Sequence, residues 1–370
     1  MDWLLFGLFL TLMFGGVPLG VAMGLAGAAV VAASGLGIMS LPTNVYTGIA
    51  KYPLMAIPVF VIAGLIFERA GVAETIVRFA SAVVGQRRGS LAIVAVLVAM
   101  ILGGISGSGP ADSAAVGAVM LPSMIKAGYP RSFTAGVIAA AGSTDILIPP
   151  SIAFVIYSLL VPQASVPALF AAGMIPGILS GLTLIGVAWW LSVRNDFEAV
   201  PYETRPPFWK SLKEAGWGLA APVIILGGMR SGYFTPTEAA VVAVFYGFAV
   251  GMLVYRTLDW RGIYDVLVES AEISAVIMLV VALASVFAWA SSTLGTFDNL
   301  AKSLLGFGAS ETVMLLLIQL LLLIAGMFLD AISIYFIFLP LLLPIAAHFQ
   351  WDLVWFGIII TMNMALGQFH

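Results

Sequence analysis

Residues 103–113 read GGISGSGPADS and interrupt an otherwise apolar stretch of the chain. Glycine and proline at this density cannot continue a helix in hydrocarbon, because proline lacks the backbone donor and glycine favours turns. Backbone groups freed in this way are tolerated at membrane depth only when they face a cavity enclosed by protein. The stretch therefore predicts a re-entrant helical hairpin over about 90–125, with its tip at Ser106-Gly107-Ser108.

The expected tip offers oxygen atoms rather than charged side chains. Its freed carbonyls and its two serine hydroxyls are hard oxygen ligands suited to sodium, while the helix that begins near Ala111 would attract an anionic group to its N-terminus. A contact of small residues that only lets two helices pack closely is the alternative. The candidate sodium ligands of the tip are Ser106, Gly107 and Ser108.

The overall composition indicates a membrane protein. Hydrophobic residues make up 62% of the 370 residues and charged residues only 9%, a balance at which a soluble domain would aggregate. Apolar stretches of about 20 residues, long enough to cross a bilayer, recur from Trp3 onwards. We therefore expect an all-α polytopic protein embedded in a lipid bilayer.

Composition also excludes several classes of function. Cysteine is absent, which removes disulfides, thiolate metal sites and cysteine nucleophiles. The net charge of -3 is spread over the loops without a basic run. Nucleic acid is therefore not expected as a partner.

A second interruption lies at residues 142–151, which read GSTDILIPPS. Its paired prolines force the preceding residue out of the helical region, so the span over about 132–160 is expected to be a broken helix with free carbonyls. These carbonyls would form a second wall of the ion site. The expected ligands of this wall are Gly142, Ser143 and Thr144.

Asp145 is an ionisable group within this otherwise uncharged stretch. A charge buried in a membrane costs about 3 kcal/mol or more and usually serves a function, so Asp145 is a candidate cation ligand. The alternative is a structural aspartate that is protonated or that caps a helix.

A third interruption, at residues 326–333, reads GMFLDAIS and carries Asp330 alone between two long apolar runs. If these runs form a second hairpin over about 312–348, Asp330 lies at its tip rather than in lipid. It can then coordinate a cation, bind substrate hydroxyls, or only cap the next helix.

The two hairpin regions resemble each other weakly, which suggests an internal repeat. In each, a Leu-Pro pair ends an apolar stretch, at Pro122 and at Pro344, and another apolar stretch follows after a turn. The longest polar run, 194–215, is interpreted as a linker between a first repeat, 1–193, and a second repeat, 216–370.

Loop charge predicts the side from which each hairpin enters, because short loops rich in Lys and Arg stay in the cytoplasm. The first hairpin is flanked by basic residues without an acid, namely Arg87, Arg88, Lys126 and Arg131. The second lacks this bias, being flanked by Asp298, Lys302, Glu311 and Asp352. The hairpins should therefore enter from opposite sides, as an inverted repeat requires.

The motif Thr235-Pro236-Thr237-Glu238 predicts the start of a helix. Thr235 can cap the helix, Pro236 fits the first helical position, and Glu238 can close a capping box. We interpret this motif as structural.

An enzymatic alternative is the intramembrane serine protease, because Gly104-Ile105-Ser106-Gly107 has the form of the nucleophile motif in rhomboid proteases. Such an enzyme needs a base beside the serine. The histidines are His348, at an expected membrane edge, and His370, at the end of the given sequence. Neither is well placed to activate Ser106, so we do not expect an enzyme.

Taken together, the motifs resemble the large membrane (M) subunit of TRAP transporters, the tripartite ATP-independent periplasmic systems. The resemblance runs almost from end to end. The segments that carry it are Pro53 to Phe60 with Ala63-Gly64, Val84-Gly85 to Gly89, Ser106 to Ser108 with Ala111-Asp112, Ile148-Pro149-Pro150-Ser151, Thr235 to Ala240, and Gly326 to Asp330 with Leu339-Pro340 and Leu343-Pro344.

This resemblance implies a sodium-driven symporter in the bacterial inner membrane that imports a small organic acid by an elevator mechanism. In such a fold, similar to that of the ion transporter superfamily, a transport domain with both hairpins slides against a scaffold. The implied partners are a small four-helix membrane subunit (Q type) and a periplasmic substrate-binding protein (P type). A stand-alone sodium/carboxylate symporter is the alternative within transport.

The resemblance also implies site residues. The family's substrate site matches Ser106, Pro149, Pro150, Ser151 and Asp330. Two or more sodium ions would bind. One sodium site would lie where Ser106 to Ser108 meets Gly142 to Thr144, and another where Gly326 meets Asn363 to Gly367.

Two features of this sequence differ from the family pattern and limit the transfer of site residues from the family. Asp145 stands where the family usually has glycine, so the first ion site is expected to differ in charge or in substrate. The given sequence ends at Gln368-Phe369-His370, where the second paired-proline break is expected to follow.

Overall fold

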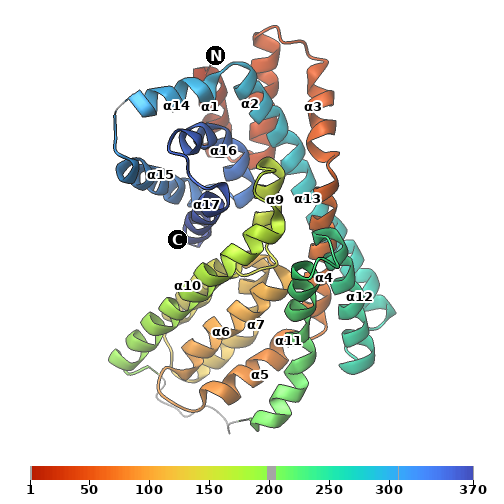
Figure 1. The fold of residues 1–370 in the computed structure, drawn as a ribbon. Coiled ribbons are helices and arrows are strands. Elements are labelled where there is room, and N and C mark those ends of the chain that lie inside the picture. Colours follow the sequence, from red (N-terminus) through yellow and green to blue (C-terminus); the bar gives the residue numbers. More distant parts are fainter. Residues whose placement is uncertain (1, 198–205, 307, 370) are drawn as a thin grey trace. The chain divides into compact units, whose positions relative to one another are not determined.

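The computed structural model describes residues 2–197, 206–306 and 308–369, and these residues form helices without a strand (Figure 1). The predicted all-α class is thus confirmed. The elements are α1 (Asp2–Phe14), α2 (Leu19–Ala33), α3 (Ser40–Ile49), η1 (Tyr52–Met55), α4 (Ala56–Arg69), α5 (Val72–Val84), α6 (Ser90–Ser106), α7 (Gly109–Lys126), α8 (Arg131–Asp145), α9 (Ile152–Leu160), α10 (Val166–Arg194), α11 (Phe208–Arg230), α12 (Pro236–Ala249), η2 (Val250–Val254), α13 (Trp260–Thr293), α14 (Thr296–Gly306), α15 (Glu311–Gly326), α16 (Ala331–His348) and α17 (Leu353–Gln368).

Several helices have the length and composition of membrane spans. Within the described part of the chain, five are long and apolar enough to cross a bilayer, namely Tyr52–Arg69, Val166–Arg194, Pro236–Val254, Trp260–Thr293 and Ala331–His348. Apolar side chains also cover the outside of shorter helices. On α15, for example, Leu316 is 58% exposed and Leu320 is 56% exposed. Such faces are stable against lipid tails but not against water.

The chain divides into two compact units, each built from separate stretches of sequence. Unit 1 comprises Met1–Met55, Ile156–Ser165 and Glu272–Gln368, and unit 2 comprises Ala56–Val155, Val166–Ala271 and Phe369–His370. Each unit contains one of the predicted hairpins. The units therefore differ from the predicted sequence repeats, which remain a prediction about internal similarity.

In unit 2, α6 and α7 form the first hairpin, and α8 packs against both of its arms. The hairpin turns at Gly107 and Ser108, where the sequence predicted its tip. The predicted broken helix is also present, since α8 ends at Asp145 and α9 begins only at Ile152. Helices α4, α5 and α10 pack around this group.

In unit 1, α15 and α16 form the second hairpin, and α17 packs along α15. The connection between the two arms spans residues 327–330, so Asp330 lies at the tip as predicted. The observed hairpins, Ser90–Lys126 and Glu311–His348, agree closely with the expected ranges.

The second arms of the two hairpins end in the same way. Helices α7 and α16 each contain 18 residues. After α7, the backbone N–H of Tyr129 donates to the carbonyl of Met124 (3.0 Å), and after α16 the N–H of Trp351 donates to Ala346 (2.9 Å). The residue before each donor has a positive φ, 99° at Gly128 and 55° at Gln350. This Schellman-type ending also follows α1, α2, α10 and α11, so it is a common helix ending in the described part of the chain.

Two further predictions concern the second half of the chain. The capping box at Thr235 is confirmed, since its backbone N–H donates to Glu238 Oε2 (2.8 Å) and the N–H of Glu238 donates to Thr235 Oγ1 (3.3 Å). The expected linker is in part helical, because α11 begins at Phe208. Residues 198–205 of that linker lie outside the described residues.

Candidate functional site

The tip of the first hairpin is ordered by the side chain of Ser106. Its hydroxyl donates to Asp112 Oδ2 (2.6 Å) and accepts from the backbone N–H of Ser108 (3.1 Å). Gly107, between them, closes α6 with φ at 67°, a left-handed conformation that glycine adopts without steric cost. Residues 106–108 therefore form a compact turn of oxygen and N–H groups at the end of a buried helix.

The structure brings this tip against the paired-proline break. A Cβ on Gly107 would collide with the carbonyl oxygen of Pro150 and stand 3.1 Å from Ser151 Cα. The backbone N–H of Ile152 donates to the carbonyl of Gly107 (3.4 Å). Ser151 is buried, and its Oγ accepts from the N–H of Phe154 at 3.5 Å. The predicted neighbourhood of the tip and the broken helix is thus present in unit 2.

The end of α8, which is predicted to form the second wall of the ion site, packs against both arms of the first hairpin. A Cβ on Gly109 would stand 2.7 Å from the carbonyl oxygen of Gly142, so the start of α7 and the end of α8 are in backbone contact. A Cβ on Gly104 would stand 3.6 Å from the carbonyl oxygen of Pro149, on the other side of the break. The approach at Gly109 requires glycine, because a side chain there would separate the two elements, whereas the distance at Gly104 is an ordinary van der Waals contact.

One detail of this wall differs from the prediction. The carbonyl of Thr144 is not free, because it accepts from the N–H groups of Leu147 (3.1 Å) and Ile148 (3.2 Å). The hydroxyls of Ser143 and Thr144 donate to carbonyls one turn earlier, each at 2.7 Å. Helix α8 ends at Asp145, and a turn closed by the N–H groups of Leu147 and Ile148 follows it before the prolines.

Asp145 is the unusual group of this region. It is fully buried, and its Oδ2 has no hydrogen-bond partner among the described residues. Its Oδ1 lies 3.2 Å from the hydroxyl oxygen of Thr144, whose single hydrogen already points to the carbonyl of Ala141 at 2.7 Å. A buried carboxylate oxygen without a donor is costly unless a cation or a proton satisfies it.

Asp112 belongs to the same polar cluster, although the sequence interpretation did not name it as a site residue. It is 4% exposed and lies in the first turn of α7. Its Oδ2 accepts from the hydroxyl of Ser106 at the hairpin tip (2.6 Å). The sequence did contain an indication of this role. An acidic residue four positions after Ser108 falls in the first turn of α7, where the helix N-terminus favours a negative charge.

In unit 1, the second candidate ion site is a contact between two glycines. A Cβ on Gly367 would stand 2.8 Å from Gly326 Cα, and one on Gly326 would stand 3.0 Å from Gly367 Cα. Helices α15 and α17 therefore touch through their backbones at the position where the family resemblance implied a second ion site, which remains a prediction. Asn363, one turn before Gly367, directs its side-chain amide to the carbonyl of Ile359 (3.0 Å).

Asp330 caps α16. Its Oδ2 accepts from the backbone N–H of Ile332 (3.1 Å), and its Oδ1 accepts from the hydroxyl of Ser333. The capping role, one of the three left open by the sequence, is therefore present. The cap holds the first turn of a helix whose Tyr335 hydroxyl is paired with Thr361 on α17 (2.7 Å).

The predicted substrate residues are divided between the units. Ser106, Pro149, Pro150 and Ser151 belong to unit 2, and Asp330 belongs to unit 1. That these five residues form one substrate site remains a prediction. The hydroxyl of Ser106 points to a carboxylate rather than an imidazole, while His348 lies in the last turn of α16 in unit 1 and His370 is outside the described residues.

Comparison with known families decides the class of the protein. A model described as tripartite ATP-independent periplasmic transporter, DctM component, matches residues 6–370. The chain belongs to this family. The interpretation of the motifs as those of a TRAP large permease is therefore confirmed.

Characterised members of the DctM family are similar over nearly the whole chain. The C4-dicarboxylate TRAP transporter large permease protein DctM of Rhodobacter capsulatus is 34% identical, with 99% of this chain and 87% of that protein covered. The sialic acid TRAP transporter large permease protein SiaM of Vibrio cholerae is 36% identical, with 97% and 86% covered. These relatives are named as permeases, which confirms that the family is not enzymatic.

The name of one longer relative, DctMQ, combines two permease designations. The isethionate TRAP transporter permease protein DctMQ of Oleidesulfovibrio alaskensis is 38% identical over 98% of this chain. The chain spans 57% of the length of that relative.

The fold of the DctM-family chain is also similar to that of a solved transporter. The crystal structure of the Alcanivorax borkumensis YdaH transporter, described as having an unusual topology, matches with a TM-score of 0.60 at 14% identity. The match covers 89% of this chain and 76% of that one. At this identity the likeness concerns the fold alone.

Proposed function

We propose that this permease imports a small carboxylate-bearing solute across the bacterial inner membrane, coupled to the inward movement of sodium. The observation that carries sodium coupling is Asp145, a fully buried carboxylate whose Oδ2 has no partner among the described residues. Its other oxygen, Oδ1, lies 3.2 Å from the hydroxyl oxygen of Thr144, and carboxylate and hydroxyl oxygens are suitable ligands for a hard monovalent cation. Sodium is a co-substrate here, released on the other side of the membrane.

The residues proposed to hold sodium in unit 2 are those of the tip and the end of α8. Ser106 is fixed by Asp112 and by the N–H of Ser108, so its hydroxyl oxygen is held in one place. The close contact of Gly109 with the carbonyl of Gly142 keeps the two walls together. In unit 1, we propose a second ion at the contact of Gly326 with Gly367, where no side chain separates the two backbones.

The proposed solute class follows from the relatives. Two of their names give carboxylate-bearing compounds, C4-dicarboxylates and sialic acid, and a third gives isethionate, which is a sulfonate; all are small organic anions. We propose that the solute is delivered by a periplasmic binding protein and that a small four-helix subunit completes the membrane complex. In an elevator mechanism, the hairpin tips would hold solute and sodium while the transport domain crosses the membrane.

The test is uptake by the purified permease, with its small membrane subunit and binding protein, in proteoliposomes. The solute is first identified by thermal-shift screening of the binding protein against C4-dicarboxylates, sialic acid and isethionate. We expect uptake only when sodium is higher outside than inside, and only when the binding protein is present. Equal uptake in potassium would contradict sodium coupling, and full uptake without the binding protein would favour a stand-alone symporter.

A further inference from the structure

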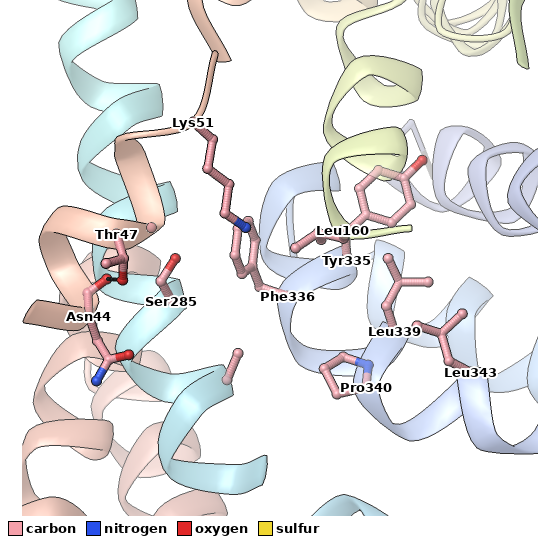
Figure 2. Close-up of a pocket in the computed structure, with 12 residues that line it drawn as sticks. Asn44, Thr47, Lys51, Leu160, Ser285, Tyr335, Phe336, Leu339, Pro340 and Leu343 are labelled. Carbon is pink, nitrogen blue, oxygen red and sulfur yellow. Dashed lines mark hydrogen bonds between the residues drawn. The ribbon is translucent and has the colours of Figure 1, made fainter. Parts of the chain in front are cut away.

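Unit 1 contains a pocket of about 280 Å³ whose walls differ in chemistry (Figure 2). One wall is the end of α3 with the facing turn of α13, and the other is a face of α16. The pocket is not part of the candidate ion sites, since none of its lining residues is among those proposed to bind sodium or solute. Its ligand can therefore be inferred from its own walls.

The first wall is polar because α3 presents polar residues at helical spacing. Asn44 and Thr47 lie one turn apart on α3, and Gly48 beside them lets α3 approach Ser285 of α13. Each of these polar side chains already donates a hydrogen bond to its own helix, at 2.9 Å for Asn44, 2.9 Å for Thr47 and 2.8 Å for Ser285. Their oxygen atoms remain as acceptors, so this wall is suited to a ligand with hydroxyl donors.

The second wall is apolar and firmly held. Phe336, Leu339 and Leu343 follow one another at helical spacing on α16 and line the pocket. Phe336 is 4% exposed and Leu339 is 1% exposed, so they belong to the core of unit 1. The neighbouring Tyr335 fixes this part of α16 through its hydrogen bond to Thr361 (2.7 Å). An apolar wall of this kind is suited to a hydrocarbon chain rather than to a sugar acid.

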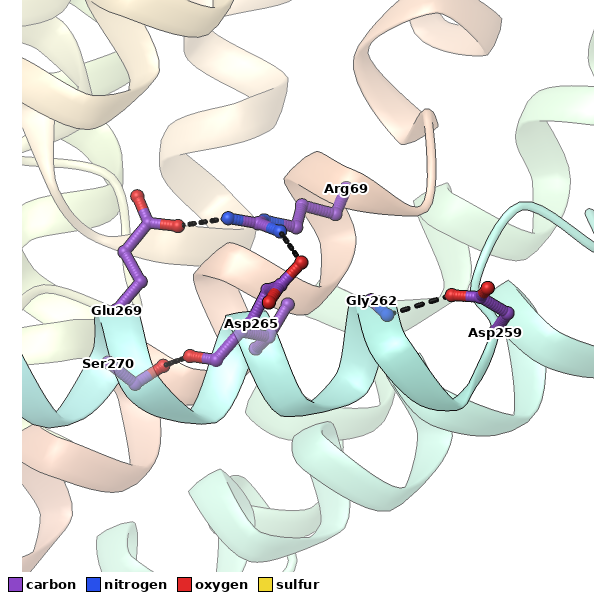
Figure 3. A network of polar contacts seen from close by, with 7 residues as sticks. Arg69, Asp259, Gly262, Asp265, Glu269 and Ser270 are labelled. Atoms are coloured by element: carbon purple, nitrogen blue, oxygen red, sulfur yellow. Dashed lines mark hydrogen bonds and ion pairs between the residues drawn. The ribbon is translucent and has the colours of Figure 1, made fainter.

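Lys51 supplies the charge of the pocket. It follows the end of α3, and its side chain extends into the space between the walls (Figure 2). No acid forms an ion pair with it among the described residues. Arg69 in unit 2 illustrates the opposite case, since it reaches Glu269 at 2.5 Å and Asp265 at 3.7 Å (Figure 3). The ammonium group of Lys51 is thus available to an anion from outside the chain.

We propose that this pocket binds an anionic phospholipid with a hydroxylated headgroup, such as phosphatidylglycerol. The phosphate pairs with Lys51, and the glycerol hydroxyls donate to the oxygen atoms of Asn44, Thr47 and Ser285. The first part of one acyl chain lies along the half-buried side chains of Pro340 and Leu343 on the apolar wall. Basic pockets between membrane helices commonly bind anionic headgroups, and one lysine contributes about 1 kcal/mol to such binding. The occupant is a bilayer lipid, because the apolar wall requires a chain that a water-soluble solute lacks.

The test compares lipid retention by the full permease complex, purified and delipidated, using native mass spectrometry with added phosphatidylglycerol or phosphatidylcholine. We expect wild-type protein to retain phosphatidylglycerol in preference to phosphatidylcholine. Lys51→Gln should weaken phosphatidylglycerol retention by about fivefold and leave phosphatidylcholine unchanged. Lys302→Gln, which removes a lysine of the same unit that does not line the pocket, is the matched control and should have no effect.

A second variant tests the position of the acyl chain. Ala288 also lines the pocket, so Ala288→Phe fills part of it without a change in charge and should reduce retention of phosphatidylglycerol. Size-exclusion profiles and helical circular dichroism verify that each variant is folded. Unchanged phosphatidylglycerol retention in Lys51→Gln, or equal loss in Lys302→Gln, would overturn the proposal. So would displacement of the lipid by a transported organic anion, since the pocket would then be a solute site.

Discussion

Gly103 on α6 lies directly against the main chain of Asp145 at the end of α8. A Cβ on Gly103 would stand 2.5 Å from Asp145 Cα and 2.7 Å from its Cβ, closer than packed atoms approach. The position of the buried carboxyl group therefore depends on the absence of a side chain on the facing helix.

Gly103→Ala is expected to destabilise the permease by about 1–3 kcal/mol, because backbone must move to make room for the methyl group. Gly136→Ala on α8 is the control, since a Cβ there would meet nothing within 4 Å. That control should be neutral or slightly stabilising, as alanine favours a helix. Thermal unfolding in detergent measures both variants, and similar unfolding temperatures for the two would contradict the packing argument.

Asp145→Asn tests the proposed ion site. The substitution preserves shape but removes the charge, so it should raise the sodium concentration for half-maximal uptake by about tenfold without loss of stability. Asp265→Asn removes a partly exposed carboxylate that lies 3.7 Å from Arg69 and should leave uptake unchanged. If Asp145→Asn instead lowered stability and preserved the sodium dependence, Asp145 would be a structural residue.

Asp330 can be tested with a pair of variants, because capping and ligand binding make different demands. Asparagine also caps helices, so Asp330→Asn should maintain stability, whereas Asp330→Ala should cost about 1 kcal/mol. If the carboxylate binds solute or sodium, both variants lose uptake. Normal uptake by Asp330→Asn would show that the side chain only caps α16.

Much of the fold followed from local chemistry. The breaks at Ser106–Ser108 and before Pro149-Pro150 were predictable because glycine and proline restrict the backbone whatever surrounds them. The close pairing of Gly326 with Gly367 was also indicated, although only through the family resemblance. These features depend on backbone geometry, which short motifs determine.

Contacts between distant segments were less predictable. Asp112 was not recognised, because its role depends on Ser106 turning back toward it across the tip, at 2.6 Å. The free carbonyl expected at Thr144 was wrong for a similar reason, as the turn after α8 supplies its own N–H donors. The division into two units also combines stretches more than 200 residues apart, a separation over which hydrophobic patterns carry no pairing information.

Gln350 provides a prediction about the endings of α7 and α16. Its φ of 55° is strained for a residue with a Cβ, whereas glycine occupies the matching position at residue 128. Gln350→Gly should stabilise the protein by roughly 0.5–1 kcal/mol. Gly128→Ala should destabilise it by a similar amount. Thermal unfolding of the two variants should shift in opposite directions, and a shift in the same direction would contradict this account.

The ending of α7 and α16 is a general device of this chain rather than a feature of the two hairpins. Helices α1, α2, α10 and α11 close with the same hydrogen bond and a residue of positive φ two positions after the helix, at Gly16, Gly35, Asp196 and Gly232. The chain therefore leaves many of its helices through one kind of backbone turn, which glycine forms without steric cost and which aspartate and glutamine also complete.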